Sequence, residues 1–357
     1  MTSPEALVSA LHRAFRPDSR FDFNDLALAL FRYQAKASAP WGRLLDHLGV
    51  DPDQIASWRG VPPMPVSAYK TTWIGIAKPG DCMPETGGRT FLSSGTTGNE
   101  SSRNGLDATA LAVYEAAAIA GWDRFPGADG LRRPVVALMP PANHVPESSL
   151  SHMAGALIDR DRGVFHAPGT DSDWIEAARS TLAACRRPVA VFGTAFAWVH
   201  FFDRDPDWRT VLPAGSVVIE TGGYKGRSRE VPVAELYGWF RDRLGVADAQ
   251  CWSEYGMSEL ASQYWSRGVA GVKHAPPWLR ARVLDPVRGS EVAAGGAGLL
   301  CHVDLANFGA ALAVRTADLG SLQACGGLRC LGRLAGAPLR GCSLAAEHWG
   351  EDDETAG

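Results

Sequence analysis

Residues 91–100 are Phe91-Leu92-Ser93-Ser94-Gly95-Thr96-Thr97-Gly98-Asn99-Glu100, and this stretch decides which fold we expect. Its glycines admit a left-handed backbone, and its hydroxyls and successive N–H groups form a concavity that binds anions. An apolar pair precedes the stretch, and a helical spacing of apolar and small residues follows it from Leu106 to Ala120. A strand, a loop and a helix in this order predict a phosphate-binding loop.

Two other interpretations of this loop have to be weighed. The loop lacks the lysine that an ordinary P-loop places directly after its second glycine, which excludes the P-loop NTPases. A stretch rich in serine and glycine is also typical of a flexible surface segment. The motifs further along the chain favour the ligand-binding interpretation.

Composition limits the class of protein and its partners. A chain of 357 residues with 46% hydrophobic and 21% charged residues is typical of a soluble globular protein with one large or two modest domains. The net charge of −4 gives no reason to expect nucleic acid or an anionic membrane as the main partner. No apolar run reaches the length of a membrane span, and no export signal is visible. We therefore expect a cytoplasmic protein.

The cysteines are odd in number and scattered, with no C-x-x-C pair. This pattern predicts free thiols in a reducing compartment and excludes a zinc site built from cysteine. The seven cysteines are Cys82, Cys185, Cys251, Cys301, Cys325, Cys330 and Cys342.

Hydrophobic periodicity predicts an α/β protein. Residues 1–90 contain amphipathic segments and form a helical region that leads into the core. Apolar runs at 134–139, 189–193 and 216–220 predict buried strands, with helices at 194–202 and 233–244, so we expect a mainly parallel sheet. The expected divisions are the helical region 1–90, the core 91–270, an antiparallel β subdomain 271–320, a C-terminal segment 321–348 and an acidic tail 349–357.

Two polar segments follow predicted strands. His144 and His152 come after the strand at 134–139, and open α/β sheets bind ligands beyond the carboxyl ends of their strands. These histidines are candidate substrate-binding residues, although a loop histidine more often is solvated or caps a helix. A second segment begins at Cys251. In this segment Tyr255 offers a flat face for a base, Ser258 offers a hydroxyl for a phosphate, and Glu259 offers an oxygen for Mg²⁺. The alternative for that segment is a turn with a packed tyrosine.

The complete set of motifs resembles the adenylate-forming enzymes. The motifs occur in that superfamily's order: Ser93–Gly98, Tyr255–Glu259, Arg315-Thr316-Ala317-Asp318 and Gly332-Arg333. Further strings resemble the acyl-protein synthetase that serves the fatty-acid reductase of bacterial luminescence: Glu147–Leu150, Glu220–Gly226 and Arg340–Ser343. The resemblance extends over nearly the whole chain.

This resemblance implies roles for the matching residues. The ATP phosphates would lie against Ser93, Ser94, Gly95, Thr96, Thr97 and Gly98, and the adenine against Gly222, Gly223, Tyr224 and Tyr255, with Gly256 and Met257 in the same motif. Ser258 would contact the α-phosphate, Glu259 would hold Mg²⁺, Asp318 would bind the ribose hydroxyls, and Arg333 would reach ribose or phosphate from a hinge. Cys342 matches the cysteine that accepts the acyl group.

The chain departs from the superfamily's pattern after Arg333. Relatives have a separate mobile C-terminal domain whose lysine holds the acyl phosphate, whereas the residues after Arg333 include no lysine. We therefore expect the superfamily's N-terminal core with the C-terminal domain largely absent. Lys225 is the candidate replacement cation, and the alternative is a loop lysine in water.

The expected function is ATP-dependent activation of a fatty or aryl acid to an acyl-adenylate, followed by transfer to a thiol. The thiol is Cys342 or belongs to a partner, and the product would pass to an acyl reductase. One alternative is a ligase that loads coenzyme A or a carrier protein. Another is a nucleotide-binding module without catalysis.

Overall fold

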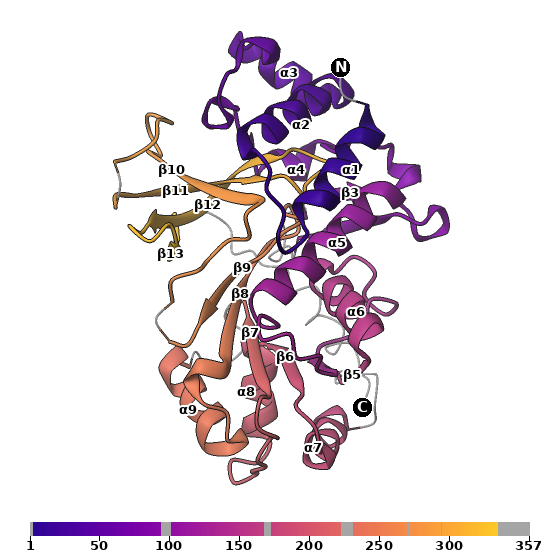
Figure 1. The fold of residues 1–357 in the computed structure, drawn as a ribbon, viewed down its shortest axis with the longest axis vertical. Coiled ribbons are helices and arrows are strands. Elements are labelled where there is room, and N and C mark those ends of the chain that lie inside the picture. The colour runs from indigo at the N-terminus through magenta and orange to yellow at the C-terminus, as the bar shows by residue number, and fades with distance from the viewer. Residues whose placement is uncertain are drawn as a thin grey trace. The chain divides into compact units, whose positions relative to one another are not determined.

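The computed structural model describes residues 3–93, 101–167, 173–222, 231–269, 271–293 and 295–334 (Figure 1). These residues form two compact units. The first unit contains the described residues up to Arg124, Gly256–Tyr264 and the described residues from His274 onward. The second unit contains Phe125–Tyr255 and Trp265–Lys273. The chain therefore leaves the first unit and returns to it twice.

The second unit is built on a six-stranded sheet, which confirms the mainly parallel sheet expected from the apolar runs. Its strands follow the order β5-β4-β6-β7-β8-β9, and the pairs from β5 to β8 are parallel. Strands β4, β6 and β7 are buried along their whole length because helices cover both faces. The strands are β4 (Val135–Leu138), β5 (Gly163–Phe165), β6 (Ala190–Thr194), β7 (Val217–Thr221), β8 (Cys251–Tyr255) and β9 (Tyr264–Arg267).

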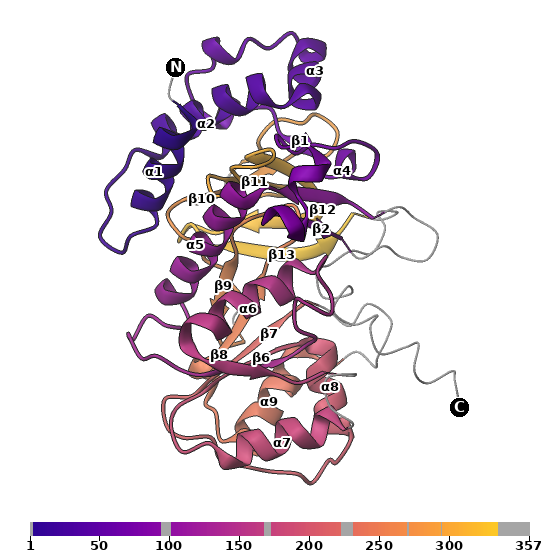
Figure 2. The ribbon, with the colours of Figure 1, turned by 90° about the vertical axis from the view of Figure 1, so that its right-hand side faces the viewer.

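Helices lie on both faces of this sheet (Figure 2). One face carries α6 (Ser149–Asp161), and the other carries α7 (Trp174–Ala184), α8 (Ala195–Asp203) and α9 (Val233–Leu244). The core on the second face contains the rings of Trp198, Phe201, Phe202 and Phe240, packed on alternate residues of the strands. The helices expected at 194–202 and 233–244 are α8 and α9.

The first unit begins with helices, as the amphipathic segments predict. Ser3 caps the first helix by accepting a hydrogen bond from the Ala6 N–H at 3.3 Å. The helices are α1 (Pro4–Ala14), α2 (Phe23–Ala37), α3 (Ala39–Leu48), α4 (Ala68–Thr71) and α5 (Ala108–Arg124). Short 3₁₀ turns are η1 (Pro52–Gln54), η2 (Trp58–Gly60), η3 (Pro79–Asp81) and η4 (Pro84–Thr86) in this unit, and η5 (Asp248–Gln250) in the other. Among helices in the described part of the chain, we find none with the length and hydrophobicity needed to cross a bilayer.

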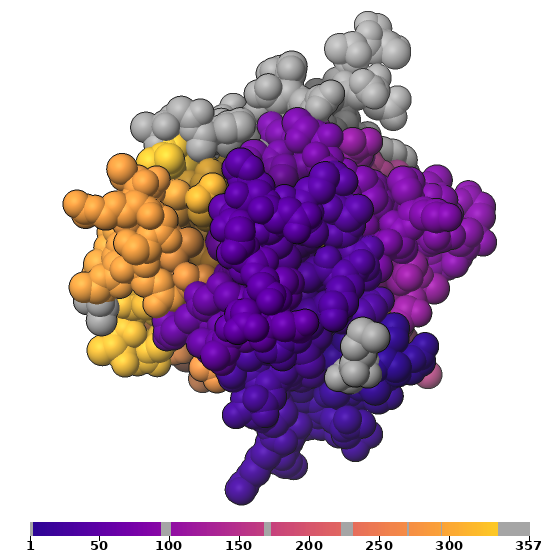
Figure 3. All heavy atoms as spheres, turned by 90° about the horizontal axis from the view of Figure 1, so that it is seen from above, coloured from indigo at the N-terminus to yellow at the C-terminus, as the bar shows by residue number. Residues whose placement is uncertain are grey.

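A mostly antiparallel sheet completes the first unit and confirms the expectation for the region after Trp278. Its order is β1-β12-β11-β10, and β13 also pairs with β12. The strands are β1 (Met64–Pro65), β10 (Leu279–Leu284), β11 (Ala297–Asp304), β12 (Ala313–Leu322) and β13 (Leu328–Arg333). Figure 3 shows the indigo N-terminal residues beside the orange and yellow residues of this sheet.

One expectation is wrong: the serine-glycine loop does not lead into a helix. It joins β2 (Arg89–Leu92) to the antiparallel strand β3 (Arg103–Leu106), and α5 begins only at Ala108. Asn104 and Gly105 are weak helix formers, and Asp107 starts the helix by accepting a hydrogen bond from the Ala110 N–H at 2.8 Å. Strand β3 therefore comes between the loop and α5 in the sequence.

Candidate active site

Ser93 closes the base of the serine-glycine loop. Its Oγ accepts a hydrogen bond from the Ser102 N–H at 2.9 Å, and its own N–H donates to the Ser102 carbonyl at 3.0 Å. Both serines are buried. This pairing extends the β2–β3 ladder by one step, so Ser93 holds the two ends of the loop together.

The segment that follows β8 is attached to the same hairpin. Ser258 is buried, and its Oγ donates a hydrogen bond to the Leu92 carbonyl at 3.1 Å. Its own carbonyl accepts a hydrogen bond from Asn104 Nδ2 at 2.7 Å. The structure therefore brings together Ser93 and Ser258, two residues that the sequence assigns to phosphate binding.

Glu259 is 1% exposed, and its backbone carbonyl accepts a hydrogen bond from Asn307 Nδ2 at 2.9 Å. Burial, and after it the negative charge of Glu259, raises the pKa of the Tyr69 phenol above its ordinary value. Across the described residues, no three His, Cys, Asp or Glu side chains gather to hold a metal ion. A lone carboxylate still fits Mg²⁺, because this ion keeps several waters and takes further ligands from substrate phosphates.

Several of the assigned residues lie at the carboxyl ends of the parallel strands, where open α/β sheets commonly bind their ligands. Gly222 follows β7 with φ 72°, a left-handed conformation that favours glycine. Tyr255 ends β8, the neighbouring strand, and is half-buried. His144 is exposed in the segment after β4, and His152 lies in the first turn of α6. Gly222 and Tyr255 thus lie at the carboxyl ends of adjacent strands.

Directly beneath Gly222 and Tyr255 is a buried polar cluster. The Thr221 hydroxyl donates a hydrogen bond to the Glu254 carboxylate and so joins the ends of β7 and β8. Lys273 Nζ donates to Ser253 Oγ at 2.7 Å. Burial raises the pKa of Glu254 to about 7, against the opposing effects of the Thr221 hydrogen bond and the Lys273 charge. Glu220 on the other face of the sheet also has a raised pKa, again because of burial.

We expect Glu254→Gln to flatten the dependence of stability on pH. The native pKa of about 7 lies above the ordinary 4.5, so the unfolded chain loses this proton first as pH rises. Wild-type stability should therefore fall between pH 4.5 and pH 7, by about 3 kcal/mol from this group. Urea unfolding at pH 5 and pH 8 measures the change. Glu220, Lys273 and Asp304 are present in both the wild type and the variant. If the two proteins showed the same dependence of stability on pH, the change could not be assigned to Glu254.

Asp318 and Arg333, assigned separately to ribose and hinge, lie against each other. They are paired residues on β12 and β13, and Arg333 Nε donates to Asp318 Oδ1 at 2.7 Å. Both side chains are 18% exposed. The pairing of β12 with β13 therefore brings these two assigned residues together.

Several assigned residues lie outside the described part of the chain. They are Ser94, Gly95, Thr96, Thr97, Gly98, Gly223, Tyr224, Lys225 and Cys342. Gly256 and Met257 are described and half-buried, at the start of the segment that carries Ser258.

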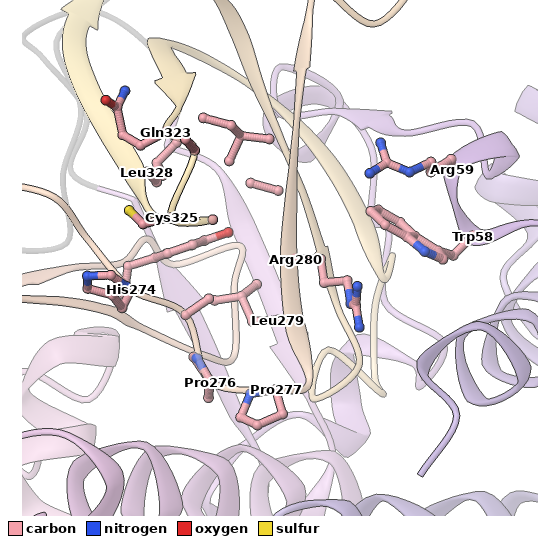
Figure 4. A pocket seen from close by; sticks show the side chains of 16 residues that line it. Trp58, Arg59, His274, Pro276, Pro277, Leu279, Arg280, Gln323, Cys325 and Leu328 are labelled. Carbon is pink, nitrogen blue, oxygen red and sulfur yellow. The ribbon is translucent and has the colours of Figure 1, made fainter. Parts of the chain in front are cut away.

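A cavity of about 470 Å³ lies in the first unit, away from the assigned residues (Figure 4). Trp58, Arg59 and Arg280 lie to one side of it, and His274 and Cys325 to the other. None of the described residues that line it is acidic. The Arg280 guanidinium lies over the Phe23 ring at 4.5 Å, so this cation already has an aromatic partner.

Sequence reasoning missed Asn104, Asn307, Asp304, Glu254 and Lys273. A signal was present for two of them, because Asp304 and Asn307 interrupt the apolar run from 299 to 314. A polar residue inside a buried run requires a hydrogen-bond partner, which marks it as a residue with a specific contact. Lys273 carried no such signal, since its partners come from a distant stretch of sequence.

No protein-family model matches the sequence. No curated protein matches it either. Solved structures do share its fold. An open conformation of 2-hydroxyisobutyryl-CoA ligase, in complex with 2-HIB-AMP and CoA, superposes with a TM-score of 0.60 at 16% identity, over 94% of this chain and 76% of that chain.

The same ligase in its postadenylation state gives a TM-score of 0.61 at 16% identity, over 90% of this chain and 71% of that one. ATP-bound MatB from Rhodopseudomonas palustris gives a TM-score of 0.51 at 18% identity over 82% of this chain. The matched part covers 56% of the MatB chain. The described structure therefore shares its α/β fold with 2-hydroxyisobutyryl-CoA ligase and with MatB.

Proposed function

We propose that this protein activates a carboxylic acid with ATP and transfers the acyl group to a thiol. The observation that carries the proposal is the fold shared over 94% of the chain with a ligase bound to 2-HIB-AMP and CoA. Low identity means that this similarity establishes fold alone, so activity rests also on the residues that match the adenylation motifs. The acid would be fatty or aryl, and the closer resemblance to acyl-protein synthetase favours an acyl thioester that an acyl reductase consumes.

In the first step, a carboxylate oxygen attacks the α-phosphorus of ATP while the bond to the β-phosphate oxygen breaks and pyrophosphate leaves. The protein takes little part in the covalent chemistry of this step. It accelerates the step mainly by positioning the reactants and by neutralising charge. Tyr255 and Gly222 are assigned to the base, Asp318 to the ribose and Ser258 to the α-phosphate. When bound, Mg²⁺ neutralises phosphate charge, and Glu259 is the residue that fits it.

In the second step, a thiolate attacks the acyl carbon and AMP leaves with the bonding electrons. Three of the six described cysteines are poorly suited to this attack, because burial raises the pKa of the Cys82, Cys251 and Cys301 thiols to about 12. Cys325 is exposed. We assign the acceptor role to Cys342, which matches the acceptor cysteine of the acyl-protein synthetases, and we take CoA, present in the ligase structure, as the alternative acceptor.

Intact-protein mass spectrometry tests this assignment. After incubation with ATP, Mg²⁺ and a mixture of fatty and aryl acids, the wild type should gain one acyl mass that hydroxylamine removes. Cys342→Ser should abolish the gain, whereas Cys325→Ser, which removes an exposed thiol elsewhere, should retain it. The added mass identifies the acid.

The other outcomes are equally informative. Loss of the gain in Cys325→Ser alone would contradict the Cys342 assignment. Pyrophosphate release without any mass gain would favour a ligase for CoA or a carrier protein. ATP binding without acid-dependent pyrophosphate release would favour a nucleotide-binding module and contradict the enzyme.

A further inference from the structure

Side chains hold the backbone of residues 258–262, which belongs to no helix or strand. Two successive carbonyl groups each accept a hydrogen bond from a buried asparagine. Asn104 Nδ2 donates to the Ser258 carbonyl at 2.7 Å, and Asn307 Nδ2 donates to the Glu259 carbonyl at 2.9 Å. Asn104 lies on β3 and Asn307 between β11 and β12, so the segment is held from two separate elements.

Both asparagines are buried, and Asn307 makes further hydrogen bonds. Asn104 is 2% exposed and Asn307 is fully buried. Asn307 Nδ2 also donates to the Ala311 carbonyl at 2.7 Å, and the main-chain carbonyl of Asn307 accepts a hydrogen bond from Gln34 Nε2 at 2.8 Å. Asn307 Nδ2 thus donates to two carbonyls at once, and Asn104 Nδ2 to a third, so these contacts restrict the peptide units on either side of Glu259.

We propose that Asn307, together with Asn104, positions the Glu259 carboxylate for metal binding, an inference that rests on the proposed function. The peptide units flanking Glu259 set the direction of its Cα–Cβ bond, and a displacement of about 0.5 Å is enough to weaken a functional constellation. Neither asparagine needs to touch the metal or the substrate. Each acts as a positioning residue, in the way that partners behind a metal ligand hold that ligand in place.

The test uses Asn307→Ala and Asn104→Ala with Asn24→Ala as the matched control. Asn24 also bridges two backbone groups of the first unit: its Nδ2 donates to the Ala56 carbonyl at 3.2 Å, and its Oδ1 accepts from the Trp58 N–H at 2.8 Å. Mn²⁺, which electron paramagnetic resonance detects directly, is titrated into each full-length protein with ATP. ATP binding without metal, thermal unfolding and steady-state kinetics are measured alongside.

For Asn307→Ala we expect the Kd of Mn²⁺ to rise about 10-fold, the scale found for residues behind a metal ligand. The kcat should fall while the KM for the acid and metal-free ATP binding stay unchanged. Asn104→Ala should change Mn²⁺ binding in the same direction, which keeps the test decisive if Asn307→Ala fails to fold. Asn24→Ala should leave Mn²⁺ binding at the wild-type value.

Unchanged Mn²⁺ affinity in the folded Asn104 and Asn307 variants would overturn the inference, as would equal weakening by Asn24→Ala. A wild type that binds no Mn²⁺ with ATP would instead show that the proposed function is wrong, and the inference would fall with it. The two failures are distinguishable because only the second affects the wild type.

Discussion

Glu259→Gln is expected to lower acid-dependent pyrophosphate release at least about 100-fold, the usual loss when one group that stabilises transition-state charge is removed. Glutamine has nearly the same shape, and the Asn307 hydrogen bond goes to the Glu259 main chain, so the backbone should remain in place. The loss would come from the missing carboxylate charge at the metal. Pyrophosphate release and Mg²⁺ dependence measure the effect together.

Glu291→Gln provides the matched control for this experiment. Glu291 lies in the same unit and pairs at the surface with Arg59 at 2.7 Å and with Arg282 at 2.6 Å. Exposed ion pairs contribute little to stability, and neither arginine has an assigned role, so turnover should stay at the wild-type value. Retained turnover in Glu259→Gln would mean that another group holds the metal.

Asp304→Ala is expected to destabilise the protein by about 4 kcal/mol or more, the largest effect on stability that we foresee. The Asp304 carboxylate is fully buried and accepts hydrogen bonds from the Ala261, Ser262 and Ala306 N–H groups and from the Ser262 hydroxyl. Alanine leaves these donors buried without an acceptor. Urea denaturation, followed by circular dichroism, measures the free energy of unfolding.

Asp285→Ala is the control for a carboxylate that caps backbone N–H groups at the surface. Asp285 Oδ1 accepts from the Val287 and Arg288 N–H groups, both at 2.8 Å, in an exposed turn. Water replaces the carboxylate there, so the loss should be far smaller than for Asp304→Ala. Equal losses in the two variants would contradict the argument from burial.

The parallel sheet could be predicted from sequence because its strands are continuous apolar runs bounded by glycine and proline. Residues 190–194 and 217–221 are buried on both faces, which removes the need for polar alternation. Strand β3 could not be predicted in this way. Its Asn104 and Gly105 carry no strand pattern, and Gly105 is required because a Cβ there would lie 2.2 Å from the Trp73 ring.

The same distinction between local pattern and distant contact applies to the candidate site. Tyr255, Ser258 and Glu259 lie close together in the sequence, so the sequence alone predicts them as candidate site residues. The residues that hold this segment are distant in sequence. Asn104 reaches the Ser258 carbonyl across more than a third of the chain, and Asn307 reaches the Glu259 carbonyl across strands β9, β10 and β11.

Sequence by itself therefore determined which side chains are candidates for the proposed adenylation, because chemical type and local spacing are properties of short stretches. Only the tertiary structure decided that the loop after Leu92 joins two strands, that Asp318 pairs with Arg333, and that buried amides hold the Glu259 backbone. Each of these results depends on hydrogen bonds between residues that are not neighbours in the sequence. A buried polar group must form such a bond, and the fold decides which partner is near enough.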